Sequence, residues 1–369
     1  MSPTATPPEL SSLNQTPEKK RLPFIIALRA LASISILWHH FALYPPLSQW
    51  ASPLAGHVLD WFEVNARSTQ IFFVIGGYVM ARSLSRHSWD LRQVGTFVAQ
   101  RYCRLGLPYL AVVVLIIPIY ALARGLLPEA VLGTPASLPQ LLAHLVFLQD
   151  ILDYEQLSAG LWFVCINFQL GLIYVAMLWL RDVLVAGRNR PAPDVVGWLG
   201  WLLALFSLFY FNLNDTLDEW GLYFFPYFFM GIVVHRSRAP GKRRTEFWLY
   251  EVALVLAMLF EWRWRLASAF VVGLLVFSAD HFGWGHHWPR GRPILWLGNV
   301  SYSLFLVHFP VLVLISAVWT QLEWHSPALA LIGLWTSFFF SLMAAAVFHR
   351  WVEQPAAALG NRYRYRAVG

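Results

Sequence analysis

The chain has 369 residues, of which 58% are hydrophobic and only 13% are charged. A soluble globular domain carries about 25% charged residues, so this composition excludes an ordinary soluble protein and indicates one embedded in a lipid bilayer. The net charge of +7 does not indicate a nucleic-acid partner, because clustered basic residues in a membrane protein face the anionic surface of the bilayer.

Apolar segments of helix-spanning length recur along the whole chain. A helix needs about 20 residues to cross the hydrocarbon layer. The apolar run 138–148 is too short to span and predicts an interfacial or re-entrant piece. We therefore predict an all-α, polytopic transmembrane helical bundle of about ten helices, at residues 23–44, 68–86, 105–123, 160–180, 195–212, 220–235, 246–260, 264–280, 294–318 and 327–350.

Basic residues orient this bundle. Lys and Arg resist translocation and gather on the cytoplasmic side. With the N-terminus placed inside, most of the 27 Lys and Arg residues fall in segments expected inside, and both termini are cytoplasmic. Residues 1–22 are expected to form a disordered cytoplasmic tail, residues 23–356 the membrane domain and residues 357–369 a second tail. The basic residues in the expected outer segments are Arg67, Arg124, Arg263 and Arg265.

Arg29 lies inside the first predicted span, and His39 and His40 lie near its outer end. At 100° per residue, Arg29 and His40 differ by a net rotation of about 20°, so they share one face roughly 16 Å apart along the axis. His39 is rotated about 80° away. An ionisable residue at membrane depth is a functional candidate by default; the alternative is that Arg29 extends to the headgroups and His40 lies in the outer interface.

Further candidates lie on other predicted spans. Arg101 and Arg104 are neighbours on one helical face at the inner end of the third span. Ser301 and His308 share a face of the ninth span, where His308 either lines a channel or only bonds to a neighbouring helix. Adjacent His286 and His287 diverge too much to chelate one metal ion well, and no other ligand spacing is suitable, so we predict no metal.

The sequence around these residues resembles the acyltransferase-3 family of membrane acyltransferases. The first helix of that family carries an arginine, ten intervening residues and a histidine, and Arg29 and His40 match this spacing. Further segments resemble the family's motifs in the expected order along nearly the whole chain. These segments are 28–32, 72–78, 97–109, 161–169, 297–310 and 350–355.

The chain departs from the family pattern at three places. Ile26 stands where the family usually has an aspartate, and Gly76 where it usually has a serine. Asn167 and Phe168 stand where one or two glutamates usually precede Gln169. These departures leave the fold assignment intact and bear on proton transfer.

The resemblance implies transfer of an acyl group, by default acetyl, from cytoplasmic acyl-CoA to a hydroxyl of an envelope glycan or a small molecule. His40 would be the general base, and Arg29, Arg101 and Arg104 would bind the phosphates of CoA. A partner for His40 is sought in Asn167 or in three acidic residues of the preceding outer segment. Those acidic residues are Asp150, Asp153 and Glu155.

Other residues are expected to line the site, and acceptor specificity is expected in the outer segments 45–67, 124–159 and 212–219. The resemblance also implies an integral membrane protein of the bacterial inner (plasma) membrane.

Two other functions stay open: a transporter or flippase of a polar substrate, and a catalytically silent relative. For Arg101 and Arg104 the alternative is a pure topology role. The expected lining residues are His39, Asn167, Ser301, Tyr302 and His308.

Overall fold

The computed structural model describes residues 22–186, 194–239 and 242–363. Within these ranges the repetitive structure is helical, and an isolated β-bridge joins Arg124 to Leu127. The expected N-terminal tail, apart from Leu22, and residues 364–369 lie outside the described part. The α-helices are α1 (Pro23–Leu43), α2 (Leu47–Asn65), α3 (Thr69–Leu84), α4 (Leu91–Arg101), α5 (Leu107–Ala123), α6 (Glu129–Leu132), α7 (Leu138–Leu145), α8 (Leu161–Val185), α9 (Val195–Phe209), α10 (Gly221–Arg236), α11 (Lys242–Phe260), α12 (Trp264–His281), α13 (Arg292–Gln321), α14 (Pro327–Phe348) and α15 (Gln354–Gly360).

Two π-helical segments, η2 (Tyr102–Gly106) and η6 (His349–Glu353), interrupt longer helices. The segment η2 joins α4 to α5, so that a continuous helix of 33 residues runs from Leu91 to Ala123. In the same way η6 joins α14 to α15 in a helix of 34 residues from Pro327 to Gly360. Single π-helical turns inside α-helices are frequent at functional sites.

Six helices in the described part are long and apolar enough to cross a membrane, which indicates a multi-pass membrane protein. Each of the ten predicted spans falls on a helix, but α3 and α10 have only 16 residues each. At 1.5 Å per residue, 16 residues extend about 24 Å, less than the roughly 30 Å of the hydrocarbon layer. The number of about ten spans and the orientation of the termini therefore stay predictions. The six helices are Pro23–Leu43, Leu91–Ala123, Leu161–Val185, Val195–Leu213, Arg292–Gln321 and Pro327–Gly360.

Most of the expected outer segment 45–67 is a helix of 19 residues, α2, that packs against α1 and α14. Its sequence has no continuous apolar run, and only one side is buried, through residues such as Leu47, Ala51 and Leu59. Contact with α1 and α14 stabilises this helix. The hydropathy of the sequence does not reveal the helix, because its apolar residues do not form a continuous run.

The segment between α5 and α8 is held by its own hydrogen bonds. Ser137 and Gln140 form a capping box at the start of α7. The ring of His144 is fully buried, with Nδ1 bonded to the carbonyl of Gln140 at 2.9 Å. The hydroxyl of Tyr102 donates to the carbonyl of Leu145 at 2.8 Å, so the short apolar piece predicted at 138–148 lies along α5 and reaches back to the beginning of η2.

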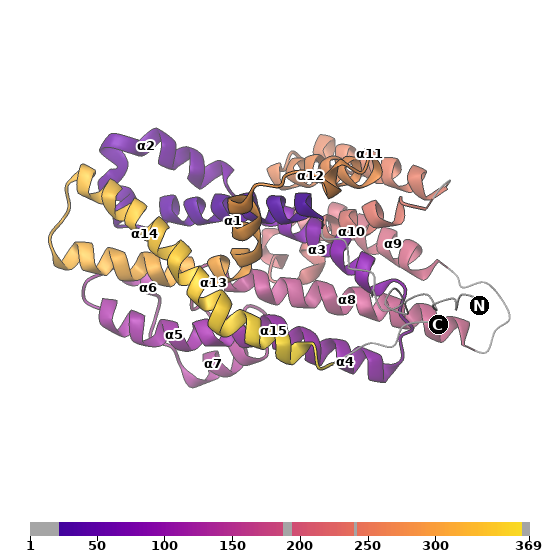
Figure 1. The fold of residues 1–369 in the computed structure, drawn as a ribbon, viewed down its shortest axis with the longest axis horizontal. Coiled ribbons are helices and arrows are strands. Elements are labelled where there is room, and N and C mark those ends of the chain that lie inside the picture. Colours follow the sequence, from indigo (N-terminus) through magenta and orange to yellow (C-terminus); the bar gives the residue numbers. More distant parts are fainter. Residues whose placement is uncertain (1–21, 187–193, 240–241, 364–369) are drawn as a thin grey trace, which may run out of the picture.

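Figure 1 shows an elongated bundle in which α1, α5, α8 and α13 run along the long axis, and α14 crosses them obliquely. At one end of the long axis α3, α8 and α10 finish, and α1 and α13 begin nearer the middle; we call the end where α8 finishes the arginine-rich end. At the other end α1 finishes beside α2, and the connections to α6 and α14 lie there. We call it the cavity end.

Two backbone contacts bring helices unusually close. A Cβ atom added at Gly77 of α3 would lie 1.9 Å from the carbonyl oxygen of Phe228, and one added at Gly231 of α10 would lie 1.9 Å from that of Val74. The two glycines therefore let the backbones of α3 and α10 touch. A Cβ atom at Gly298 of α13 would similarly lie 2.0 Å from the carbonyl oxygen of Ile26 in α1.

We predict that Gly231→Ala lowers the midpoint of thermal unfolding of the purified protein by more than about 5 °C, because the added methyl group overlaps a backbone that has no room to move. The matched control is Gly95→Ala in α4, where an added Cβ atom meets nothing within 4 Å. That change should leave the midpoint equal or raise it, since an exposed helical glycine costs about 0.5–1 kcal/mol. An unchanged or raised midpoint in Gly231→Ala would contradict the contact between α3 and α10.

Candidate active site

His40 and His308 meet inside the bundle. Nδ1 of His40, in the last turn of α1, lies 2.7 Å from Nε2 of His308 in the middle of α13. The two rings are within 5° of parallel, and the residues are 8% and 1% exposed. The structure thus brings together two residues that the sequence placed on separate spans.

The hydrogen bonds fix the tautomers of both rings in their neutral state. Nδ1 of His308 lies 3.1 Å from the carbonyl of Leu304, which can only accept, so this nitrogen carries the hydrogen. Nε2 of His308 is then an acceptor, and Nδ1–H of His40 donates to it. The remaining nitrogen of His40, Nε2, keeps its lone pair. Within the described residues it has no hydrogen-bond partner, so it is the basic atom of the pair.

His40 lines a cavity of about 590 Å³ at the cavity end of the bundle. This volume is in the range of small-molecule binding sites. The walls come from α1, α3, α8, α10, α13, the end of α5, the beginning of α12 and the segment between α5 and α8. Tyr44, Trp162 and Phe309 contribute aromatic faces, and two arginines and three carboxylates add charge. The charged lining residues are Arg67, Arg265, Glu129, Glu155 and Asp218.

Several polar atoms on this wall have unused hydrogen-bonding capacity. In the part of the chain that the structure describes, four buried atoms lack a partner: Nδ1 of His39, Oε1 of Gln70, Oε1 of Gln156 and Oγ of Ser158. Buried polar groups are nearly always hydrogen-bonded in native proteins. These atoms are therefore suited to a ligand that carries several hydroxyl or amide groups.

Acidic groups near the cavity have altered acidity. Burial raises the pKa of Asp150 to about 6, and the nearby carboxylates of Glu219 and Asp218 act in the same direction. Burial also raises the pKa of Asp218 and of Glu219. Asp150 accepts a hydrogen bond from the side-chain amide of Gln156, and Glu155 from Thr134. The atom that orients His40 is Nε2 of His308, and none of the acidic residues considered from the sequence occupies that place.

Arg29 lies toward the arginine-rich end of α1. Its nearest charged neighbours are Glu353 of η6 and Arg104 of η2. Glu353 also accepts hydrogen bonds from the hydroxyl of Ser303, at 2.5 Å, and pairs with Nδ1 of His349 at 2.9 Å. The side chain of Arg29 is therefore among protein charges at the two π-helical segments.

Arg101 and Arg104 point in different directions. The guanidinium of Arg101 donates to the backbone carbonyl of Asn167 at 2.8 Å and to its side-chain oxygen. Gly171 leaves the space for it, since an added Cβ atom there would lie 2.7 Å from Nε of Arg101. Arg104 is exposed and packs against Gly360 of α15. Asn167 is thus bonded to Arg101 and not to His40.

Two other predicted lining residues have structural partners. The hydroxyl of Ser301 donates to the carbonyl of Gly298 in its own helix at 2.9 Å. The hydroxyl of Tyr302 donates to the carbonyl of Leu105 in η2 at 2.7 Å, which ties α13 to that π-helical segment. His39 lines the cavity beside His40.

Among the residues described, no group of three or more His, Cys, Asp or Glu side chains is arranged to hold a metal ion.

Sequence reasoning missed the His40–His308 contact, whereas the outer segments 45–67, 124–159 and 212–219, where acceptor specificity was expected, contribute residues such as Arg67, Ser158 and Asp218 to the cavity wall. A buried histidine on each of two spans was a usable signal, because ionisable groups at membrane depth pair with one another. Gln70 gave no such signal, since it lies in an apolar context at the beginning of α3.

A family model described as an acyltransferase domain matches residues 22–347. No curated protein and no solved structure matches the chain. The matched range includes Arg29, His40, Arg101, Arg104 and His308, and ends just before η6. The chain therefore belongs to the acyltransferase-3 family of membrane acyltransferases.

Proposed function

We propose that this acyltransferase moves an acyl group from acyl-CoA to a hydroxyl of an envelope glycan or a related small molecule. The acyl group is expected to be acetyl. The observation that carries the proposal is the hydrogen-bonded pair His40–His308 on the wall of the 590 Å³ cavity. It supplies a free imidazole nitrogen next to a space that accepts a polar ligand.

The reaction needs one base and one acid, and His40 supplies both. Nε2 of His40 takes the proton of the acceptor hydroxyl while the hydroxyl oxygen attacks the thioester carbonyl carbon. The carbon–sulfur bond then breaks, and the thiolate of CoA takes the proton from the imidazolium. The hydrogen bond to Nε2 of His308 holds the ring in the correct tautomer and stabilises its positive charge.

The donor is proposed to bind from the arginine-rich end. CoA carries several phosphate charges, and guanidinium groups bind phosphate in a bidentate manner. Arg104 is exposed, and its positive charge acts on Arg29. Arg101 is held in place by its hydrogen bonds to Asn167. These three arginines would place the thioester toward His40 along α1.

The acceptor is proposed to bind in the cavity. Aromatic faces such as that of Trp162 suit the apolar faces of sugar rings, and the unpartnered atoms of Gln70 and Ser158 suit their hydroxyls. With the arginine-rich end facing the cytoplasm, the cavity opens on the opposite side of a bacterial plasma membrane. A cytoplasmic donor and an envelope acceptor then approach His40 from opposite ends of the bundle.

We predict that His40→Ala lowers kcat by about 10²–10⁴-fold, because the general base is lost. The measurement is transfer of label from radiolabelled acetyl-CoA to lipid-linked glycans extracted from host membranes, catalysed by the purified protein in liposomes. The control is His57→Ala, an exposed histidine of α2 at the same end, which should transfer at the wild-type rate.

Undiminished transfer by His40→Ala would exclude this base. Translocation of the glycan by the wild-type protein without acylation would favour the transporter instead, and neither activity would favour a catalytically silent relative.

A second prediction concerns His308. His308→Leu should lower kcat by roughly 10–100-fold, because a hydrogen bond to a charged group contributes about 1.5–3 kcal/mol. His308→Gln keeps an acceptor for Nδ1–H of His40 and should retain more activity. Equal rates for the two variants across pH 6–9 (an interval chosen to bracket the ordinary histidine pKa of about 6.5) would mean that His308 has only a packing role.

A third prediction concerns the donor. Arg104→Gln should raise KM for acetyl-CoA by about tenfold with little change in kcat, since a phosphate contact contributes to ground-state and transition-state binding alike. Arg92→Gln removes a charge from another exposed arginine, in α4, and should leave KM unchanged. An unaltered KM in Arg104→Gln would remove Arg104 from the donor site.

A further inference from the structure

A second large cavity lies at the arginine-rich end of the bundle. Its volume is about 810 Å³, and its walls come from α3, α8, α10 and the beginnings of α9 and α11. Arg29, Arg101 and Arg104 are not among its lining residues. Six arginines line it instead, together with His235 and a single carboxylate, Asp194. The arginines are Arg82, Arg86, Arg181, Arg236, Arg238 and Arg243.

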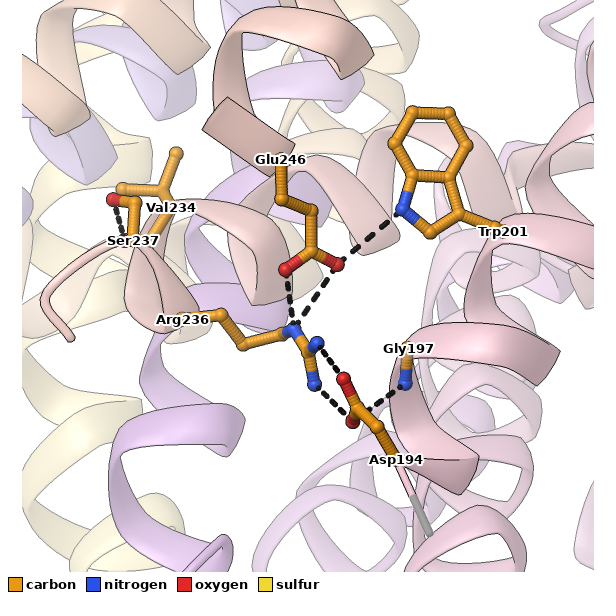
Figure 2. A network of polar contacts seen from close by, with 7 residues as sticks. All are labelled: Asp194, Gly197, Trp201, Val234, Arg236, Ser237 and Glu246. Carbon is orange, nitrogen blue, oxygen red and sulfur yellow. Dashed lines mark hydrogen bonds and ion pairs between the residues drawn. The ribbon is translucent and has the colours of Figure 1, made fainter. Parts of the chain in front are cut away.

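Part of this positive charge is neutralised within the protein. Figure 2 shows the guanidinium of Arg236 between two carboxylates. Its terminal nitrogens pair with Asp194 at 2.9 and 2.5 Å, and its Nε lies 3.0 Å from Glu246. These two ion pairs hold Arg236, whose side chain is only 9% exposed, and the hydrogen bonds from Arg236 lower the pKa of Asp194. Asp194 therefore stays ionised at neutral pH, and both of its carboxylate oxygens accept hydrogen bonds from Arg236.

Two further arginines have their own partners. Arg181 pairs with Asp182 at 2.6 Å and donates to the carbonyls of Ser85 and His87. Arg238 lies 3.5 Å from Asp280. These contacts hold both side chains on the cavity wall.

Arg86 and Arg243 are exposed at its rim, and within the described ranges neither has an ion-pair partner within 4.0 Å. Six guanidinium groups line the cavity. The carboxylates that form ion pairs with them number four: Asp182, Asp194, Glu246 and Asp280. The cavity therefore carries a surplus of positive charge. Nδ1 of His235, on its wall, is a further buried atom without a partner in the described part of the chain.

The basic cavity is distinct from the cavity that His40 lines, and no described residue lines both. The same three helices, α3, α8 and α10, line both, but between the two spaces Gly77 and Gly231 bring the backbones of α3 and α10 into contact. The rings of Phe73, Phe163 and Phe224 pack on one another in the same layer, with centroids 4.9 and 5.0 Å apart. A ligand in the basic cavity is therefore separated from His40 by packed backbone and aromatic rings.

We propose that the basic cavity is a second ligand site, distinct from the acyl-transfer site, and that it binds a phosphate group of an anionic lipid headgroup or of a soluble phosphate compound. Guanidinium groups suit phosphate because they donate two parallel hydrogen bonds. Basic pockets between helices at a membrane surface suit anionic headgroups. The volume accommodates either source.

The test uses the purified full-length protein in a neutral detergent, with two probes. Calorimetric titration with inorganic pyrophosphate measures binding of a soluble phosphate compound. Native mass spectrometry with phosphatidylglycerol, against phosphatidylcholine as the zwitterionic reference, measures binding of a lipid headgroup. We expect saturable binding in one arm, and that arm identifies the source. The double variant Arg86→Gln/Arg243→Gln should weaken it at least about tenfold, because two charge-assisted contacts are lost.

The matched control is Arg92→Gln/Arg290→Gln, which removes the same charge from two exposed arginines outside the cavity wall and should bind within about twofold of wild type. Arg86→Lys/Arg243→Lys keeps the charge and should bind more tightly than the Gln pair. The proposal is overturned if neither probe binds saturably, if the Gln pair binds like the wild type, or if the control weakens binding equally.

Discussion

The hydrogen bond between Nδ1 of His40 and Nε2 of His308 is the interaction on which the proposed chemistry depends. It joins the first helix to the thirteenth, fixes which nitrogen of His40 carries a proton, and leaves the other facing the cavity. Because a second histidine replaces the usual carboxylate partner of a catalytic imidazole, the pair carries no net charge at rest. A neutral pair is far less costly to bury between helices than an ion pair.

Close packing of α1 on α13 makes this hydrogen bond possible. Gly298 leaves room for the carbonyl of Ile26 and so lets the two helices approach. Ile26 is also a place where the chain departs from its family, and an apolar side chain there fits this tight contact, since Cγ2 of Ile26 lies 2.5 Å from an ideal Cβ atom at Gly298. Asn167, another departure, bonds to Arg101 and leaves His40 unaffected. Ile26 therefore serves the packing of α1 on α13 that brings the two histidines together, and Asn167 holds Arg101.

The two ends of the bundle have different electrostatic character. Carboxylates, amides, aromatic rings and two arginines mix in the cavity around His40, whereas the opposite end gathers arginines around two π-helical segments and a second cavity. The α3–α10 backbone contact and the aromatic layer beside it separate these spaces. This arrangement suits a protein that receives anionic and neutral ligands from opposite sides.

The sequence by itself determined the membrane class, the helical positions of all ten predicted segments and the family. It also singled out the candidate residues Arg29, His40, Arg101, Arg104 and His308. These predictions were possible because hydropathy, charge and motif spacing are local properties of the chain. Only the tertiary structure decided that His308 and not an acidic residue bonds to His40, that α2 is a helix, and that Arg101 bonds to Asn167. His40 and His308 are 268 residues apart in sequence. Their contact depends on how α1 packs against α13, and helix packing follows from the shapes of several side chains at once, which no local pattern records.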